Sequence, residues 1–184
     1  MIVGIDEVGR GCWAGPVVAG AVLLAKPIRG LRDSKLLTRK ARERLDAEIR
    51  VTAQAFGLGW VTPVEIDAWG LTEAVRVAMR RAFTAITVPY ERIIIDGNHN
   101  FFADVPGSEA LIGADNLVPA VSAASIVAKV ARDRFMAGMA TQFPGYSFER
   151  HVGYGTAAHR AALKVKGLCE LHRRSFKPVQ AFIV

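Results

Sequence analysis

An apolar segment that ends in two adjacent carboxylates, Asp6 and Glu7, constrains the fold of this chain more than any other feature. Residues 2–5 favour a buried strand, and acids at the end of such a strand are costly unless a cation or hydrogen bonds compensate them. A flexible Gly9-Arg10-Gly11 segment follows, which lets backbone N–H groups approach a ligand beside a guanidinium. Carboxylates for a metal ion combined with amides for a phosphate ester are typical of nucleases.

Length and composition indicate one compact domain. The chain has 184 residues, 51% of them hydrophobic, so we expect a single domain over residues 1–184 with a helical C-terminal extension from about residue 143. No apolar run is long enough to cross a bilayer, and no basic segment precedes the first apolar stretch, so we expect no membrane contact and no secretory signal. Cys12 and Cys169 lack metal-motif spacing, which favours a reduced, cytoplasmic protein. We expect a monomer.

The positive charge gathers near the C-terminus. The net charge is +7, and from residue 151 onward six basic residues stand against one acidic residue. A solvated helix face explains such a cluster, and a surface that follows a nucleic-acid backbone explains it equally well.

The order of the expected elements is that of an α/β protein. Strands are predicted at 2–7, 17–24, 53–61 and 92–96, with a short fifth strand at 116–119. Helices are predicted at 39–50 after an N-cap at Thr38, from 63, from about 72, at 121–139, between Thr156 and Gly167, and just before Pro178.

The helix expected at 121–139 divides into two faces. One face is apolar and carries Ala124, Val127, Ala131 and Phe135. The other face is polar and carries Ser122, Ser125, Lys129 and Asp133.

Two further acids, Asp96 and Asp115, belong with the first pair. Asp96 ends an apolar strand as Asp6 does, and functional groups of α/β sheets gather at one end of the strands. Clustered carboxylates raise one another's pKa values unless cations intervene. Two divalent ions about 4 Å apart would make the four acids a ligand set for in-line phosphoryl displacement. Ligands that are all oxygen favour Mg²⁺ or Mn²⁺.

Each acid also has an ordinary structural explanation. Asp96-Gly97 is compatible with a simple turn, and Asp115 with a solvated turn or a distant N-cap. Asp6 and Glu7 are harder to explain in this way, because Arg10 is the one counter-charge in the neighbouring sequence.

Motifs spread over nearly the whole chain resemble those of one enzyme family. They are Gly4–Gly11 (GIDEVGRG), Gly15–Val18 (GPVV), Asp33–Lys35 (DSK), Ile95–Asn98 (IDGN), Ser122–Lys129 (SAASIVAK), Arg132–Arg134 (RDR), Gly153–Thr156 (GYGT) and His172–Phe176 (HRRSF). In this order, from residue 4 to about 179, the chain resembles ribonuclease HII, the bacterial type 2 ribonuclease H. The resemblance implies a ribonuclease H-like fold with a mixed five-stranded central sheet flanked by helices. It also implies metal-dependent endonucleolytic cleavage of the RNA strand of RNA–DNA hybrids and at ribonucleotides embedded in duplex DNA.

The resemblance also assigns roles to residues. The family's catalytic and metal-binding acids fall on Asp6, Glu7, Asp96 and Asp115. The turn that senses the ribose 2′-OH falls on Gly9, Arg10 and Gly11, with Tyr154 contacting the same sugar. A phosphate-binding helix face would be supplied by Ser122, Ser125 and Lys129.

The mechanism expected from these roles uses two Mg²⁺ or Mn²⁺ ions bridged by Asp6. Water attacks the phosphorus on the 5′ side of the ribonucleotide and leaves 3′-hydroxyl and 5′-phosphate ends. The residues from about 143 onward would contact the substrate. The tail 179–184 bears a weak similarity to a sliding-clamp peptide, but a plain apolar tail is the favoured interpretation.

Other residues receive weaker interpretations. Asp133 is expected to be ion-paired, His151 and His159 to pack or form hydrogen bonds, and His99 to support Asp96 from behind. Asp33, Ser34 and Lys35 would position the substrate or the first turn. Cys12 and Trp13 depart from the family's usual proline and aliphatic residue, which affects packing more than chemistry.

Rival functions remain open at this point. A resolvase or transposase core would share the acids but cut all-DNA duplexes equally. A non-catalytic hybrid-binding module would need no clustered acids, and a glycosidase built on Asp6 and Glu7 would leave the basic surface unexplained. Arg10 and a first strand at the very start of the sequence disfavour the related ribonuclease HIII, which has Gly-Lys-Gly at this turn and an added N-terminal domain.

Overall fold

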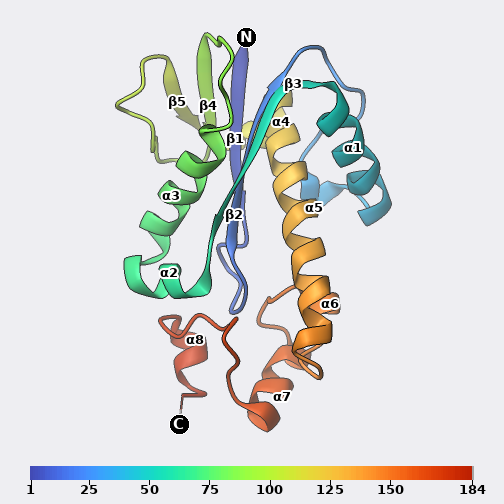
Figure 1. Ribbon diagram of the computed structural model, residues 1–184, viewed down its shortest axis with the longest axis vertical. Helices are drawn as coiled ribbons and strands as arrows, with labels where there is room; N and C mark the ends of the chain where they lie inside the picture. Colours follow the sequence, from blue (N-terminus) through green and yellow to red (C-terminus); the bar gives the residue numbers. More distant parts are fainter. Residues whose placement is uncertain (184) are drawn as a thin grey trace.

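A five-stranded mixed sheet forms the centre of the computed structural model, which describes residues 1–183 (Figure 1). The strands are β1 (Ile2–Val8), β2 (Val17–Leu24), β3 (Ala53–Val61), β4 (Arg92–Asp96) and β5 (Ser108–Leu111). Their order across the sheet is β3-β2-β1-β4-β5. β1 runs antiparallel to β2 and parallel to β4, so the carboxyl ends of β1 and β4 meet at one edge. The expected mixed five-stranded sheet is confirmed.

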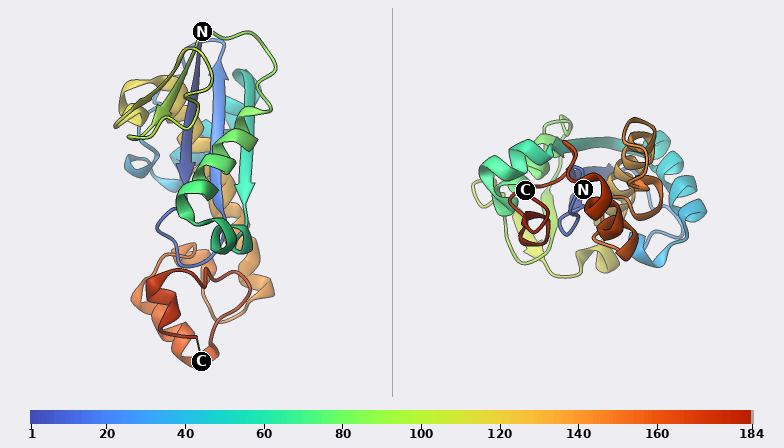
Figure 2. Two further views of the ribbon diagram at one scale, coloured as in Figure 1. Left: turned by 90° about the vertical axis from the view of Figure 1, so that its left-hand side faces the viewer. Right: turned by 90° about the horizontal axis from the view of Figure 1, so that it is seen from below.

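Helices cover both faces of this sheet (Figures 1 and 2). On one face α3 (Leu71–Phe83), which follows the short α2 (Pro63–Trp69), packs against β2 and β3. On the other face α5 (Pro119–Gln142) lies along β1 and β2, with α1 (Arg39–Thr52) beside it. A Cβ built on Gly4 would lie 2.1 Å from the Ala120 carbonyl carbon, so glycine lets the start of α5 touch β1 directly.

The expected fifth strand at 116–119 is wrong. The edge strand is β5, and residues Ala114–Leu117 form the one-turn helix α4. Gly113 adopts a left-handed conformation (φ 70°) that turns the chain into α4, and the Val118 N–H donates to the Ala114 carbonyl. The apolar residues of this segment therefore complete a helical turn.

The C-terminal segment lies below the sheet in Figure 1, around an apolar cluster of its own. It contains α6 (Phe148–His151), α7 (Ala157–Lys166) and α8 (Lys177–Gln180). The predicted N-cap at Thr156 and helix end at Gly167 are confirmed. The helix expected before Pro178 is wrong, because α8 begins at Lys177 and holds Pro178 in its first turn, where no backbone N–H is needed.

The two-faced character expected for α5 is wrong for its first half. Between Ala120 and Ala128 every residue is buried, including Ser122 and Ser125, because the sheet, α1 and α4 surround the helix. Lys129 and Asp133 keep partial exposure, with side chains 17% and 25% accessible. Among the described residues, no helix combines the length and apolar character needed to span a membrane.

Candidate active site

The parallel pairing of β1 with β4 brings two acids together at the sheet edge. Ile5 pairs with Ile95, so Asp6 and Asp96 occupy the next position on neighbouring strands. Asp6 is only 5% exposed, and its Oδ1 accepts a hydrogen bond from the Glu7 N–H (2.7 Å). One carboxylate oxygen from each of Asp6, Asp96 and Asp115 lies within 4.8 Å of the other two.

Asp115 reaches this group because Asp96 itself anchors α4. The Ala114 N–H donates to Asp96 Oδ1 (2.8 Å), which fixes the start of the helical turn that carries Asp115. From below, the Ser122 hydroxyl donates to the Asp115 carbonyl (2.6 Å). Asp115 is thereby held at 4% exposure against the strand ends.

The three acids repel one another in this buried setting. Burial, and then the charges of Glu7 and Asp96, raise the pKa of Asp6 well above its usual value. Burial, followed by Asp96 and Asp33, raises the pKa of Asp115, while Lys35 opposes the rise. Buried carboxylates that oppose one another fit divalent cations, and a donor set made only of oxygen fits Mg²⁺ or Mn²⁺.

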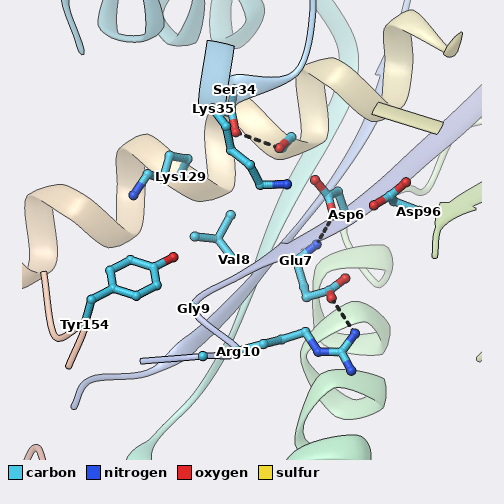
Figure 3. A pocket seen from close by; sticks show the side chains of 12 residues that line it. Asp6, Glu7, Val8, Gly9, Arg10, Ser34, Lys35, Asp96, Lys129 and Tyr154 are labelled. Atoms are coloured by element: carbon cyan, nitrogen blue, oxygen red, sulfur yellow. Dashed lines mark hydrogen bonds and ion pairs between the residues drawn. The ribbon is translucent and has the colours of Figure 1, made fainter. Parts of the chain in front are cut away.

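Glu7 stands apart from the group of three because it is engaged elsewhere. Arg10 Nη1 donates to Glu7 Oε1 over 3.0 Å, as Figure 3 shows. Burial raises the pKa of Glu7 above its usual value, although the Arg10 guanidinium opposes the rise. The fourth predicted acid is therefore at the site and paired with the arginine of the glycine-rich turn.

These side chains line one pocket of about 220 Å³ (Figure 3). Its lining residues are Asp6, Glu7, Val8, Gly9, Arg10, Gly11, Ser34, Lys35, Asp96, Ser125, Lys129 and Tyr154. The sequence motifs 4–11, 33–35, 122–129 and 153–156 thus converge on a single cavity.

The polar residues opposite the acids are organised by their own contacts. The Ser34 and Ser125 hydroxyls lie 3.0 Å apart, which ties the segment before α1 to α5. The Lys35 side chain extends toward Asp6 in Figure 3. Lys129 Nζ binds Asp133 Oδ1 (2.8 Å) and lies 5.9 Å from the centre of the Tyr154 ring.

Two fully buried guanidiniums hold the glycine-rich turn in place. Arg132 donates to the carbonyls of Ala14, Pro16 and Val152 over 2.8–3.1 Å. Arg173 donates to the carbonyls of Arg10 and Gly15 over 2.8–3.0 Å. Both are 0% exposed, and burial lowers the pKa of Arg173 to about 10. Sequence reasoning gave them no role, because their partners are backbone carbonyls that leave no mark in the sequence.

Some predicted residues lie elsewhere or act differently. Ser122 is 3% exposed and supports α4 from below the pocket. His99 is exposed and its ring lies beside Phe101, with centroids 5.9 Å apart.

Asp133 is ion-paired with Lys129, as expected. His151 and His159 are buried and hydrogen-bonded, also as expected.

Comparison with known proteins agrees with this geometry. The family model for ribonuclease HII matches residues 3–179. The ribonuclease HII of Halorhodospira halophila is 48% identical over 185 residues, which cover 99% of this chain and 94% of that protein.

Solved structures show the same architecture. The ribonuclease H2 of Pyrococcus horikoshii superposes with a TM-score of 0.83 at 26% identity, covering 98% of this chain and 96% of that one. The RNase HII of Archaeoglobus fulgidus, solved in complex with PCNA, gives a TM-score of 0.82 at 27% identity, covering 96% and 95%.

Proposed function

Because this chain belongs to the ribonuclease HII family, we propose that it hydrolyses RNA in RNA–DNA hybrids, and cuts 5′ to ribonucleotides embedded in duplex DNA, at the pocket described above. One observation carries the assignment of the site. The carboxylates of Asp6, Asp96 and Asp115 lie within 4.8 Å of one another, beside a cavity that a glycine-rich turn and a tyrosine also line. A resolvase-like core would share the acids, but it would have no use for a wall shaped to meet a ribose.

The acids are proposed to hold divalent cations. Asp6, Asp96 and Asp115 are the ligands, and Glu7 joins them on release from Arg10. The chemistry that a bound pair of Mg²⁺ or Mn²⁺ ions supplies is a more acidic water and charge neutralisation at the phosphate. Water is the attacking nucleophile, so the proposed products are a 3′-hydroxyl and a 5′-phosphate.

The chain's own residues are proposed to orient the scissile nucleotide. The backbone of Gly9, Arg10 and Gly11 and the Tyr154 side chain face the ribose, where a 2′-OH supplies both a donor and an acceptor. Ser125, Lys35 and Lys129 line the same cavity, where ammonium and hydroxyl groups suit the phosphates. Ser122 is left out of this set because its hydroxyl is committed to Asp115.

The C-terminal segment is proposed to extend the substrate surface beyond the pocket. Residues 143–184 carry Tyr154 to the cavity, and most of the net positive charge lies from residue 151 onward. Clustered cations bind the phosphate backbone without regard to sequence. A hybrid or a duplex with one ribonucleotide would therefore span both the sheet edge and this segment.

A sliding-clamp contact through residues 179–184 would need a local rearrangement. Val179 is buried, and Phe182 packs against the apolar cluster of the C-terminal segment. Val184 lies outside the described residues. A tail of this kind would have to release Phe182 before presenting it to a partner.

The test is a cleavage assay on a DNA duplex that holds one ribonucleotide. We expect a cut on its 5′ side with Mg²⁺ or Mn²⁺, no cut with EDTA, and no cut of the matched all-DNA duplex. Equal cutting of the all-DNA duplex would favour the resolvase-like function, and a 2′,3′-cyclic phosphate product would refute water as the nucleophile.

Asp6→Asn supplies the matched variant for this assay. The substitution keeps the side-chain shape but removes the charge that holds cations, so we expect turnover to fall about 100- to 1,000-fold. Duplex affinity, measured by fluorescence anisotropy, should stay within about threefold because cations elsewhere bind the phosphates. A variant with normal turnover would remove Asp6 from the catalytic group.

A further inference from the structure

We propose that His159 and His172 are positioning residues that fix the Tyr154 backbone and so hold the Tyr154 side chain at the pocket. The two histidines lie outside the pocket, and neither is an acid or a metal ligand. The proposal rests on the proposed function, because it assumes that Tyr154 reads the sugar.

A chain of hydrogen bonds runs from a loop in the C-terminal segment to the Tyr154 carbonyl. His159 Nδ1 lies 2.9 Å from the Tyr154 carbonyl oxygen, and His159 Nε2 lies 3.0 Å from His172 Nε2. The Cys169 N–H donates to His172 Nδ1 over 2.9 Å.

These partners determine where the protons reside. A carbonyl oxygen only accepts, so His159 Nδ1 carries a proton and its Nε2 is an acceptor. His172 must then donate from Nε2, so its Nδ1 accepts from the Cys169 N–H (2.9 Å) and cannot donate to the Cys169 carbonyl 3.2 Å away. Both rings are neutral, and each bond in the chain fixes the direction of the next.

A third histidine holds the other side of the tyrosine. His151 Nε2 donates to the Tyr146 carbonyl (2.7 Å), and its Nδ1 accepts from the Gly153 N–H (3.2 Å). The His151 ring stacks on His159 with centroids 4.4 Å apart. Hydrogen bonds therefore hold the backbone on both sides of Tyr154, at the Gly153 N–H and at the Tyr154 carbonyl.

The turn needs these hydrogen bonds because its backbone is strained. Val152 has φ 44°, which is costly for a β-branched residue, and Gly153 has φ 90°. A Cβ at Gly153 would lie 2.1 Å from the Ala14 carbonyl oxygen, so the turn passes directly over the segment that follows Gly9–Gly11. A turn of this kind stays in place only when its surroundings hold it there.

The surroundings keep the imidazoles uncharged. The titratable side chains that face them are His151, Tyr146 and Cys169, and none of these is a carboxylate. Burial lowers the pKa of both His159 and His172 to about 4, with smaller effects from the neighbouring histidines. At neutral pH both imidazoles are therefore uncharged, and each hydrogen bond in the chain keeps the same donor and acceptor.

The test uses two substitutions at His159, each of which keeps a different one of its two hydrogen bonds. An asparagine amide reaches the position of Nδ1 and can still donate to the Tyr154 carbonyl, whereas a glutamine amide reaches the position of Nε2 and cannot. On the single-ribonucleotide duplex we expect His159→Gln to lower kcat about 10-fold and His159→Asn to stay within about threefold of the parent. Thermal melting of each variant verifies that it is folded.

A double-mutant cycle with Tyr154→Ala separates positioning from folding. If His159 acts through Tyr154, His159→Gln should have less than a twofold effect on kcat once the tyrosine is gone. An equal loss in both backgrounds, or equal loss in the Asn and Gln variants, overturns the proposal while leaving the proposed function intact. If Tyr154→Ala alone cleaves normally, the sugar-reading assignment of Tyr154 falls, and this inference falls with it.

Discussion

Among single residues, Gly9 and Gly11 occupy the same turn for different physical reasons. Gly9 has φ 96°, and a Cβ there would lie 2.3 Å from Arg132 Nε, so the protein's own packing requires glycine. At Gly11 a Cβ would meet no atom within 4 Å. The space above Gly11 is open toward the pocket, which fits a backbone that must come close to a ligand.

The two glycines should therefore respond differently to alanine. We expect Gly9→Ala to destabilise the fold by about 1–3 kcal/mol, because it adds backbone strain and a clash. Gly11→Ala should change the free energy of unfolding by less than about 0.5 kcal/mol, yet slow cleavage of the ribonucleotide duplex about 10-fold. Urea unfolding and the cleavage assay measure the two effects. Normal cleavage by Gly11→Ala would place the substrate elsewhere.

Between elements, the buried guanidiniums join segments that the sheet leaves unconnected. Arg132 of α5 binds the turn that follows β1 and also the Val152 carbonyl in the C-terminal segment. Neither Arg132 nor Arg173 has a carboxylate within ion-pair distance among residues 1–183, and backbone carbonyls accept all of their hydrogen bonds. Fully satisfied networks of this kind are costly to disrupt.

Arg132→Met tests this junction. The substitution leaves the carbonyls of Ala14, Pro16 and Val152 without their donor, so we expect a loss of about 2–4 kcal/mol in the free energy of unfolding. Arg150→Met is the matched control, because the Arg150 side chain is 83% exposed and should change stability by less than about 0.5 kcal/mol. Equal urea midpoints for the two variants would contradict the role given to Arg132.

An element could be predicted when its own residues determine it, and was missed when contacts with distant residues determine it. The apolar runs before Asp6 and Asp96 predict β1 and β4, and the same pattern predicts that their acids meet. β5 was missed because Ser108–Leu111 is a half-exposed edge strand with little apolar character, and its pairing with β4 fixes it. The roles of Arg132 and Arg173 could not be predicted, since a sequence does not distinguish a buried arginine from a solvated one.

For the whole molecule, the buried histidines link folding to pH. His159 and His172 have folded-state pKa values of about 4, below the value of about 6.5 for an exposed histidine. The unfolded chain therefore binds more protons between these values. The contribution of both groups to stability is complete above about pH 6.5 and is lost as the pH falls toward 4.

This contribution should be visible as a difference between variants. We expect the urea midpoint of the parent to lose part of its advantage over His172→Gln as the pH falls from 7.5 to 5. A direct comparison is needed because burial raises the pKa values of the Asp6 and Asp115 carboxyls, so their protonation favours the fold as the pH falls. A difference between the midpoints that does not change with pH would contradict the buried, neutral state of His172.

The hydrogen bond from Arg173 to the Arg10 carbonyl joins residues 163 positions apart, which gives protein synthesis a defined order of events. A ribosome-bound chain that has emerged only to residue 142 already carries Asp6, Glu7, Asp96 and Asp115. It still lacks the guanidinium that braces the glycine-rich turn, and the tyrosine that faces it. The carboxylates can gather while translation continues. The ribose-facing wall is completed only when the segment that carries Arg173 leaves the ribosome.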